Sequence, residues 1–458
     1  MKLIHLLIIT FCFSYPFSIQ AWNNGDNNHF KSDCTLPGLE WFPDAKFGIF
    51  IHMTLQNVPM TPEESSTYKH SHSKAREIAS RLDLSNYDAK EQAKMFKEWG
   101  AQYVVLTTKH HVGFALFDGP DDFNVMNSSN VKRDIVREFV DALREEGIKV
   151  GIYFSLPDWT HPDYASVANE KLPISERKAT RAYAIETDTI KWNRFVKDMH
   201  EQVRFLCTNY GKIDLLWFDG DWERNGEQWK SKDLAAMIYE LQPECVVNNR
   251  LRDPDLGHYA TPEFNIPLSR RESWWEYCMT PSDSWDGEGA DQNMKTPAEL
   301  IRIFSDVVGL GGNVLMNVVP LDKGALTEPQ VTTLSEVGNW INKNSEAIFE
   351  AQCDFPLGLY DGPVTRKGKN LYLFVHDIPK TGIYLKGTQN NIKRASILEN
   401  GKELAWKYVG GDENGKKRWL LNIDLPKEDI SEYTTVVKLE FEDENIEFRT
   451  PDGNPYKL

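Results

Sequence analysis

One unit recurs along the chain: an amphipathic helix ends at a glycine, and a short apolar strand follows that ends in polar or aromatic residues. Three copies follow one another, with helices expected at residues 89–99, 132–146 and 191–210 and strands at residues 103–108, 150–154 and 213–219. Gly100, Gly147 and Gly211 stand at the helix ends, where glycine is the usual stop signal. Strands that alternate with helices predict a parallel sheet.

The alternation continues on both sides of this central part. Further strands are expected at residues 46–52, 245–250, 274–279 and 313–319, and further helices at residues 231–241, 297–308 and 328–349. About seven or eight such strands predict a (β/α)8-like (TIM-type) barrel. After Ala351, short alternating segments with Asn-Gly turns predict an antiparallel β-sandwich. We therefore expect a barrel domain at residues 22–350 and a C-terminal β-sandwich domain at residues 351–458.

The N-terminus has the pattern of a secretory signal peptide. Lys2 precedes an apolar run at residues 3–13, and the small residue Ala21 follows. The run is shorter than the roughly 20 residues that span a bilayer, and no later stretch of the sequence is long and apolar enough to do so. We expect residues 1–21 to be a signal peptide and the protein to be secreted or periplasmic, without insertion into the membrane.

The net charge and the cysteine content limit which partners, disulfides and metal sites we expect. A net charge of −16 disfavours nucleic acid and anionic membranes, because like charges repel. The cysteines after the signal are scattered, which predicts neither a disulfide framework nor a metal cluster. They are expected to be small buried hydrophobic residues, and they are Cys34, Cys207, Cys245, Cys278 and Cys353.

The strand at residues 213–219 ends in a carboxylate. Side chains alternate along a strand, so Asp219 shares a face with the apolar Leu215 and Trp217. Burying a lone carboxylate is costly, and sites form at the C-terminal ends of parallel strands. Asp219 is therefore a candidate functional residue. The alternative is that it caps the turn at Gly220.

Residues at the ends of the other strands would meet Asp219 on one rim of a barrel. They are His52, His110, His111, Tyr153, Arg250 and Glu276, and Trp217 would join them from the same strand as Asp219. The histidines lack the spacing of zinc ligands, and a regular strand would point His110 and His111 to opposite faces. Neutral histidine can instead bind sugar hydroxyls. There is no phosphate loop, nucleotide fingerprint or nucleophile elbow. Paired carboxylates are typical of glycoside cleavage, so we expect no metal and no organic cofactor.

A series of motifs in this order resembles the α-L-fucosidases of glycoside hydrolase family 29. The motifs are Lys-Phe-Gly-Ile-Phe-Ile-His at 46–52, Lys-His-His-Val-Gly-Phe at 109–114, Trp-Phe-Asp-Gly at 217–220, Trp-Glu-Tyr-Cys-Met-Thr at 275–280 and Gly-Gly-Asn-Val-Leu-Met-Asn-Val at 311–318. The resemblance implies a retaining hydrolase of terminal α-L-fucosyl residues, with a fucosylated oligosaccharide or glycoconjugate as its partner. It also implies a barrel followed by a β-sandwich.

The resemblance assigns roles position by position. Asp219 matches the family's nucleophile in its Trp-Phe-Asp-Gly motif, and Glu263 best matches the stretch that carries the acid/base, with Glu276 as the alternative. Tyr153 matches a sugar-binding residue, with Phe154 as the alternative. Trp285 resembles an aromatic residue that lines the pocket for the sugar's methyl group. The other residues that match positions holding the sugar are His52, His110, His111, Trp217 and Arg250.

The chain also departs from the family pattern. Met53 and Thr54 stand where Trp-Gly usually follows the first histidine, and Val112 stands where Asp usually follows the histidine pair. These changes can reshape the pocket, so an α-L-galactosidase or related glycosidase on the same scaffold stays open. L-Galactose carries a hydroxyl where fucose has its methyl group, and a polar group near Trp285 would favour it. A catalytically silent sugar-binding protein is the alternative from another class.

Overall fold

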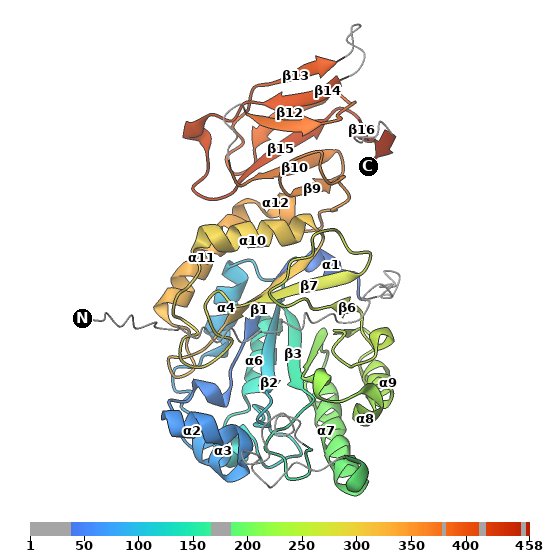
Figure 1. Ribbon diagram of the computed structural model, residues 1–458. Coiled ribbons are helices and arrows are strands. Elements are labelled where there is room, and N and C mark those ends of the chain that lie inside the picture. The colour runs from blue at the N-terminus through green and yellow to red at the C-terminus, as the bar shows by residue number, and fades with distance from the viewer. Residues whose placement is uncertain (1–37, 166–184, 378–381, 412–417, 450–454) are drawn as a thin grey trace, which may run out of the picture.

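The computed structural model describes residues 38–165, 185–377, 382–411, 418–449 and 455–458 (Figure 1). The signal peptide expected at residues 1–21, and Cys34, lie outside the described residues. None of the helices in these ranges has the length and apolar character needed to cross a membrane.

Eight strands form one parallel sheet in the order β5-β4-β3-β2-β1-β8-β7-β6. They are β1 (Phe47–Ile51), β2 (Tyr103–Lys109), β3 (Lys149–Ser155), β4 (Leu215–Asp219), β5 (Val246–Val247), β6 (Tyr259–Ala260), β7 (Trp274–Met279) and β8 (Asn313–Val318). The two edge strands meet through backbone hydrogen bonds, from Asn249 N to Tyr259 O at 2.9 Å and from His258 N to Val247 O at 2.7 Å. The predicted (β/α)8-like barrel is therefore confirmed.

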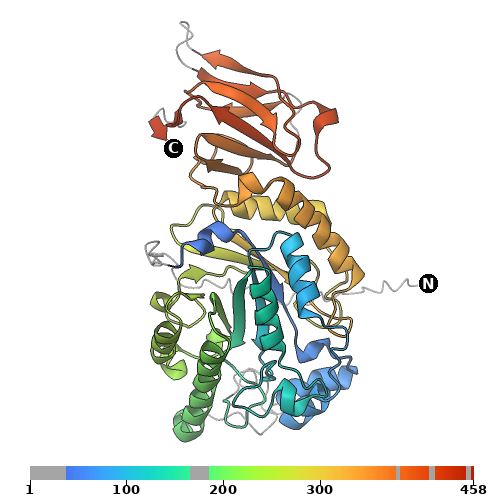
Figure 2. The same ribbon diagram turned by 180° about the vertical axis from the view of Figure 1, so that it is seen from behind.

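Helices cover the outside of the barrel (Figures 1 and 2). The main ones are α4 (Ala89–Glu98), α6 (Ile135–Glu145), α7 (Thr189–Asn209), α9 (Ser231–Leu241), α10 (Pro297–Gly309) and α11 (Glu328–Lys343). Shorter ones are α1 (Trp41–Ala45), α2 (Pro62–Thr67), α3 (His72–Ala79), α5 (Val125–Ser128), α8 (Gly226–Trp229) and α12 (Ser345–Ile348). Gly100, Gly147 and Gly211 adopt φ of +88°, +67° and +70° just after α4, α6 and α7, as their stop role requires.

Two details differ from the expected alternation. Between β5 and β7, where every residue is described, the structure has a single 3-10 turn at Pro254–Leu256 and no α-helix. The helix expected at residues 328–349 is split at Asn344, whose backbone leaves the helical region with φ −109° and ψ 15°. The side-chain amide of Asn344 donates to the carbonyl of Trp340 at 2.9 Å, which offers the backbone an alternative to a continuous helix.

Aromatic side chains fill the inside of the barrel. Phe50, Tyr103, Tyr153 and Trp217 belong to one buried cluster there. Phe42 of α1 joins this cluster, and its ring lies 4.3 Å from the ring of Tyr259, so α1 covers the N-terminal end of the strands. A second, larger core lies between the strands and the outer helices. Because α1 covers only the N-terminal end, a functional site can form at the C-terminal ends of the strands.

The C-terminal part forms two antiparallel sheets around a core of its own, which confirms the predicted β-sandwich. One sheet has the order β12-β15-β10-β9 and the other β11-β14-β13. Their strands are β9 (Val364–Lys367), β10 (Asn370–Val375), β11 (Ile383–Lys386), β12 (Ile392–Ile397), β13 (Trp406–Gly411), β14 (Arg418–Ile423) and β15 (Thr435–Phe441), followed by a hairpin of β16 (Glu447–Arg449) and β17 (Pro455–Lys457). The sandwich packs beside α10–α12, and α2 and α3 lie at the other end of the barrel (Figures 1 and 2).

The close contact of Gly48 with Tyr103 gives a test of this packing. A Cβ atom at Gly48 would lie 2.4 Å from the Tyr103 ring, so Gly48→Ala should lower the free energy of unfolding by about 1–3 kcal/mol through overpacking. Gly226→Ala is the control, because the nearest atom to its Cβ lies at 3.5 Å and it sits at the start of α8. Chemical denaturation followed by fluorescence measures both. Equal midpoints for the two variants would contradict this account of the barrel interior.

Candidate active site

A cavity of about 300 Å³ opens at the C-terminal ends of the barrel strands. It brings together nine residues singled out from the sequence, namely His52, His110, His111, Tyr153, Trp217, Asp219, Arg250, Glu263 and Trp285. Val112, at one of the positions that depart from the family pattern, also lines it. Met53, at the other, is buried in the outer core instead. No described residue of the β-sandwich lines this cavity.

Asp219 is the last residue of β4 and the most tightly held acid in the cavity. Its Oδ1 accepts a hydrogen bond from Arg250 Nη1 at 2.6 Å, and its Oδ2 accepts one from the Tyr153 hydroxyl at 2.9 Å. Burial alone would raise the pKa of this carboxyl, but the charge of Arg250 and these hydrogen bonds lower it below its usual value. Asp219 is therefore an ionised carboxylate at neutral pH, as a nucleophile must be.

Arg250 joins the two candidate carboxylates. Its Nη1 binds Asp219, and its Nη2 donates to Glu263 Oε2 at 3.1 Å. The guanidinium also lies 4.5 Å above the ring of Trp217, and its Nε donates to Thr261 Oγ1 at 2.9 Å. Burial opposes the charge on Arg250, yet the Asp219 carboxylate raises the pKa of the guanidinium. One fixed cation thus places both acids on the same side of the cavity.

Glu263 is the more accessible of the two acids. Its side chain is 38% exposed, against 12% for Asp219. The indole Nε1 of Trp285 donates to Glu263 Oε1 at 3.1 Å, so Arg250 and Trp285 hold one oxygen each. A carboxyl that reaches both the cavity and solvent can exchange protons during a reaction, which is what general acid/base chemistry requires.

The three histidines face the cavity together. The expectation that His110 and His111 point to opposite faces is wrong, because β2 ends at Lys109 after a register shift, and the two rings lie 4.3 Å apart. His52 Nδ1 pairs with Asn317 Oδ1 at 2.6 Å, and His111 Nδ1 with Ser155 Oγ at 2.9 Å. Burial lowers the pKa of His52 to about 4 and that of His110 to about 3, and it also lowers the pKa of His111.

All three imidazoles are therefore neutral near pH 7, and neutral imidazole can donate and accept hydrogen bonds from sugar hydroxyls. Across the described ranges, no group of three or more His, Cys, Asp or Glu side chains is placed to hold a metal ion.

The two members of each pair of alternatives lie in different places in the structure. Tyr153 points into the cavity, whereas Phe154 is buried in the outer core. Glu276 on β7 is 0% exposed and lies inside the barrel. It accepts hydrogen bonds from the Tyr103 hydroxyl at 2.5 Å and from Trp217 Nε1 at 2.8 Å. Glu276 thus supports Trp217 from below, while Glu263 lines the cavity.

Several residues of the site were not singled out from the sequence. Ser155 bonds both the Tyr153 hydroxyl, at 2.8 Å, and His111. Ser155 sits on β3 two residues after Tyr153, so the alternation of side chains along that strand could have found it. Asn317 sits on β8, a strand for which the sequence offered no candidate residue. Trp222 lies in a one-turn 3-10 helix at Asp221–Glu223 and Asp286 in the loop after β7, and neither segment is long enough or regular enough to show a periodic pattern. The remaining wall is formed by Phe50, Gln56, Tyr68, Lys69, Trp159 and Cys278.

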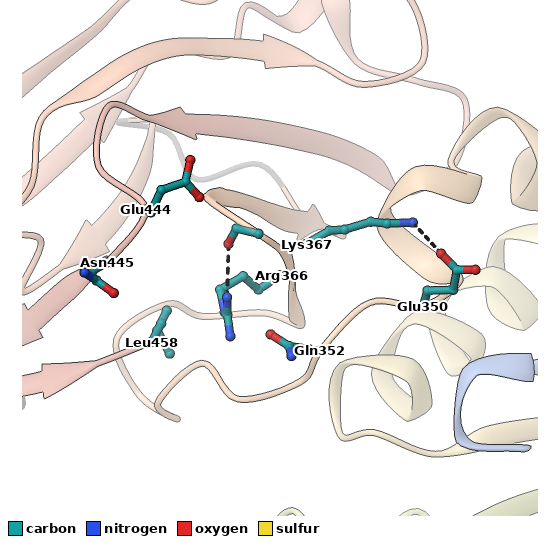
Figure 3. A pocket seen from close by; sticks show the side chains of 8 residues that line it. Glu350, Gln352, Arg366, Lys367, Glu444, Asn445 and Leu458 are labelled. Atoms are coloured by element: carbon teal, nitrogen blue, oxygen red, sulfur yellow. Dashed lines mark hydrogen bonds and ion pairs between the residues drawn. The ribbon is translucent and has the colours of Figure 1, made fainter. Parts of the chain in front are cut away.

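A second cavity, of about 490 Å³, lies where the barrel meets the sandwich (Figure 3). Its charged groups all have partners: Lys367 pairs with Glu350 at 3.0 Å within the wall, and Arg366 and Glu444 pair with Asp354 at 2.5 Å and Lys369 at 3.4 Å outside it. Its walls carry no aromatic residue and no histidine; they are Glu350, Gln352, Arg366, Lys367, Gly368, Glu444, Asn445 and Leu458. Paired surface charges without convergent donors do not make a binding site.

Paired carboxylates in a sugar-sized aromatic pocket are the equipment of glycoside hydrolases, and this is the class that the fold and the cavity define. The family model described as alpha-L-fucosidase matches residues 22–346. The chain belongs to the alpha-L-fucosidase family, family 29 of the glycoside hydrolases.

Individual members of the family resemble this chain in sequence and in structure. The tissue alpha-L-fucosidase of Homo sapiens is 30% identical over 377 residues, covering 75% of this chain and 76% of its own. The solved alpha-L-fucosidase isoenzyme 1 from Paenibacillus thiaminolyticus has a TM-score of 0.79 at 33% identity, covering 89% of this chain and 99% of its own. A structure from Bacteroides thetaiotaomicron, described as a trapped covalent intermediate of an alpha-L-fucosidase, has a TM-score of 0.75 at 27% identity, covering 89% and 96%.

The buried Glu276 gives a pH test. Burial raises its pKa from 4.5 to about 7, so the folded protein holds this proton more tightly than the unfolded chain. Stability is then lost as the pH rises from 4.5 to about 7. Glu276→Gln keeps a neutral group of the same shape, so it should gain stability relative to the parent as the pH rises, by up to about 3 kcal/mol. Denaturation midpoints at pH 5 and pH 8 measure this, and a pH-independent difference would show that Glu276 does not titrate in this range.

Proposed function

We propose that this protein is a retaining exo-glycosidase that hydrolyses terminal α-L-fucosyl residues of oligosaccharides or glycoconjugates. The observation that carries the proposal is the single guanidinium of Arg250 bonded to both Asp219 and Glu263. Membership of the alpha-L-fucosidase family supports the choice of sugar. A retaining pair needs its carboxyl groups about 5–5.5 Å apart, and two acids that share one guanidinium suit that requirement better than the wider spacing of inverting enzymes.

In the first step, Asp219 attacks the anomeric carbon and forms a glycosyl-enzyme, while Glu263 gives its proton to the departing oxygen. In the second step, Glu263 takes a proton from water, and the water oxygen displaces Asp219 from the sugar with a second inversion. The lowered pKa of Asp219 suits a nucleophile that also leaves in the second step. The covalent intermediate trapped in the Bacteroides thetaiotaomicron relative supports this route.

The other cavity residues bind the sugar in this proposal. Neutral His52, His110 and His111 bond its hydroxyls, and Tyr153 orients Asp219. Trp217 offers a flat ring to the apolar face of the sugar. The ring of Trp285, 6.0 Å from that of Phe50, suits the methyl group at C5.

L-Galactose is the second candidate substrate. The feature of the cavity wall that bears on it is the carboxylate of Asp286, the residue after Trp285, which would accept a hydrogen bond from the additional hydroxyl of that sugar if it faced C6. Turnover of an aryl α-L-fucoside against an aryl α-L-galactoside decides between the two.

We also propose that the protein is secreted or periplasmic, because residues 1–21 have the pattern of a signal peptide. Cell fractionation tests this.

Replacing the proposed nucleophile should stop the chemical step. Asp219→Ala should lower kcat on an aryl α-L-fucoside by at least about 1,000-fold while the protein stays folded. Azide should restore part of the rate by filling the gap and should yield a glycosyl azide of inverted configuration. Asp233→Ala, on the exposed face of α9, is the control and should leave kcat unchanged. Turnover near that of the parent in Asp219→Ala would remove Asp219 from the mechanism.

The proposed acid/base should matter most for poor leaving groups, because a good leaving group departs without a proton. Glu263→Ala should therefore slow a natural fucosyl disaccharide far more than an activated aryl fucoside. Glu276→Gln is the matched control: Glu276 lies outside the cavity, so it should affect both substrates evenly. Leaving-group dependence in the Glu276 variant alone would exchange the two assignments.

A further inference from the structure

The mechanism above leaves one carboxylate of the cavity wall without a role. Asp286 lines the cavity beside His52, Gln56 and Lys69, and its Oδ2 accepts a hydrogen bond from Thr54 Oγ1 at 2.7 Å. Thr54 is 7% exposed, so this bond is shielded from water. A carboxylate has about four lone-pair sites, and Thr54 occupies one of them.

The loop that carries Asp286 is fixed to the loop after β1 at a second point. Gly287 N donates to Asn57 Oδ1 at 3.0 Å, and the Asn57 amide donates in turn to the carbonyl of His52 at 2.8 Å. A Cβ at Gly287 would lie 2.5 Å from the side chain of Gln56, so the two loops pack closely there. Asp286 is therefore held in place before any sugar binds, which is the condition for a specific hydrogen bond at low entropic cost.

The contacts of the two carboxylates show where in the cavity each one lies. His111 Nε2 lies 3.5 Å from Asp219 Oδ2, whereas the loop of Asp286 is connected through Gly287 and Asn57 to the backbone of His52, whose ring lies 6.0 Å from that of His110. The charges around the histidines agree with this arrangement. Burial is the main cause that lowers the pKa of His52 and of His110, and the Asp286 carboxylate opposes this more strongly than Asp219 does. At His111 burial again lowers the pKa, but here Asp219 opposes it more strongly than Asp286. The cavity thus has an Asp219–His111 end, which holds the anomeric carbon in the proposed reaction, and an Asp286–His52–His110 end, which faces the ring hydroxyls.

The side chains of Trp285 and Asp286 form hydrogen bonds with different partners, although the Trp285 ring also lies 5.2 Å from that of His52. The indole of Trp285 bonds Glu263 and lies 5.4 Å from the ring of Phe264, whereas the carboxylate of Asp286 bonds Thr54 in the loop after β1. The apolar wall that suits the sugar's methyl group and the carboxylate are therefore distinct surfaces. This separation favours a ring hydroxyl over the hydroxyl on C6 of L-galactose as the partner of Asp286.

We propose that Asp286 is a specificity-determining residue that accepts a hydrogen bond from the C3 or C4 hydroxyl of the terminal sugar, and that Thr54 is the residue that positions it. The inference rests on the proposed function and deepens it. Thr54 stands where the family pattern has glycine, which has no hydroxyl to hold a carboxylate.

The test compares the full-length protein and its variants on an aryl α-L-fucoside, on its 3-deoxy and 4-deoxy analogues, and on an aryl α-L-galactoside. Asp286→Asn should lower kcat/KM on the parent fucoside by about 10- to 100-fold. The loss should nearly vanish on the one deoxy analogue that lacks the partner hydroxyl. Thr54→Val should show part of the same pattern, and the double variant should lose less than the product of the two single losses.

Asp283→Asn is the matched control, because Asp283 lies in the same segment, is exposed and bonds Asn293 Nδ2 at 2.7 Å. Its kinetics should equal those of the parent. Equal losses in Asp286→Asn on the fucoside and both deoxy analogues, or a loss confined to the galactoside, would overturn the assignment while leaving the proposed hydrolysis intact. If the parent protein cleaves no aryl fucoside, the proposed function fails and the assignment fails with it. Melting temperatures of all variants separate these outcomes from misfolding.

Discussion

The ion pair between Arg250 and Asp219 is the interaction on which the site depends, because a buried carboxylate without a partner would take up a proton. The pair is held from below. Arg250 lies over Trp217, whose indole donates to Glu276 at 2.8 Å, and Glu276 in turn accepts the Tyr103 hydroxyl at 2.5 Å. The chemistry at the rim therefore rests on a polar network inside the barrel.

The same burial that makes this pair necessary also sets the state of the histidines. Desolvation keeps His52, His110 and His111 neutral, so the cavity contains one strong cation, Arg250, next to the carboxylates, with Lys69 at the wall. A neutral sugar is bound best by groups that both donate and accept, and a cationic histidine would instead compete with Arg250 for Asp219. Desolvation thus divides the cavity into a charged reacting end and a largely neutral binding surface.

The sequence predicts the parts that periodicity and local signals determine. Helices that stop at Gly100, Gly147 and Gly211, and strands that end in candidate residues, follow from short-range rules. These candidate residues meet at one cavity, except Glu276, which was expected on the same rim and is buried inside the barrel. The relation of His110 to His111 was missed because a register shift next to Lys109 breaks the alternation on which the expectation relied. The break at Asn344 depends on one side-chain hydrogen bond, and the helix pattern around it gives no sign of it.

Contacts between loops cannot be predicted from sequence patterns. Thr54 and Asp286 are 232 positions apart, and neither belongs to a strand or to an α-helix. The two residues come together only in the folded barrel, because β8 pairs with both β1 and β7 and so brings the loops after β1 and β7 close to each other. Asp219, the proposed nucleophile, and its partner Arg250 instead lie at or just beyond strand ends, which the barrel itself positions. A change at Thr54, one of the positions where this chain departs from the family pattern, can therefore alter which sugar is accepted without moving the carboxylate that attacks it.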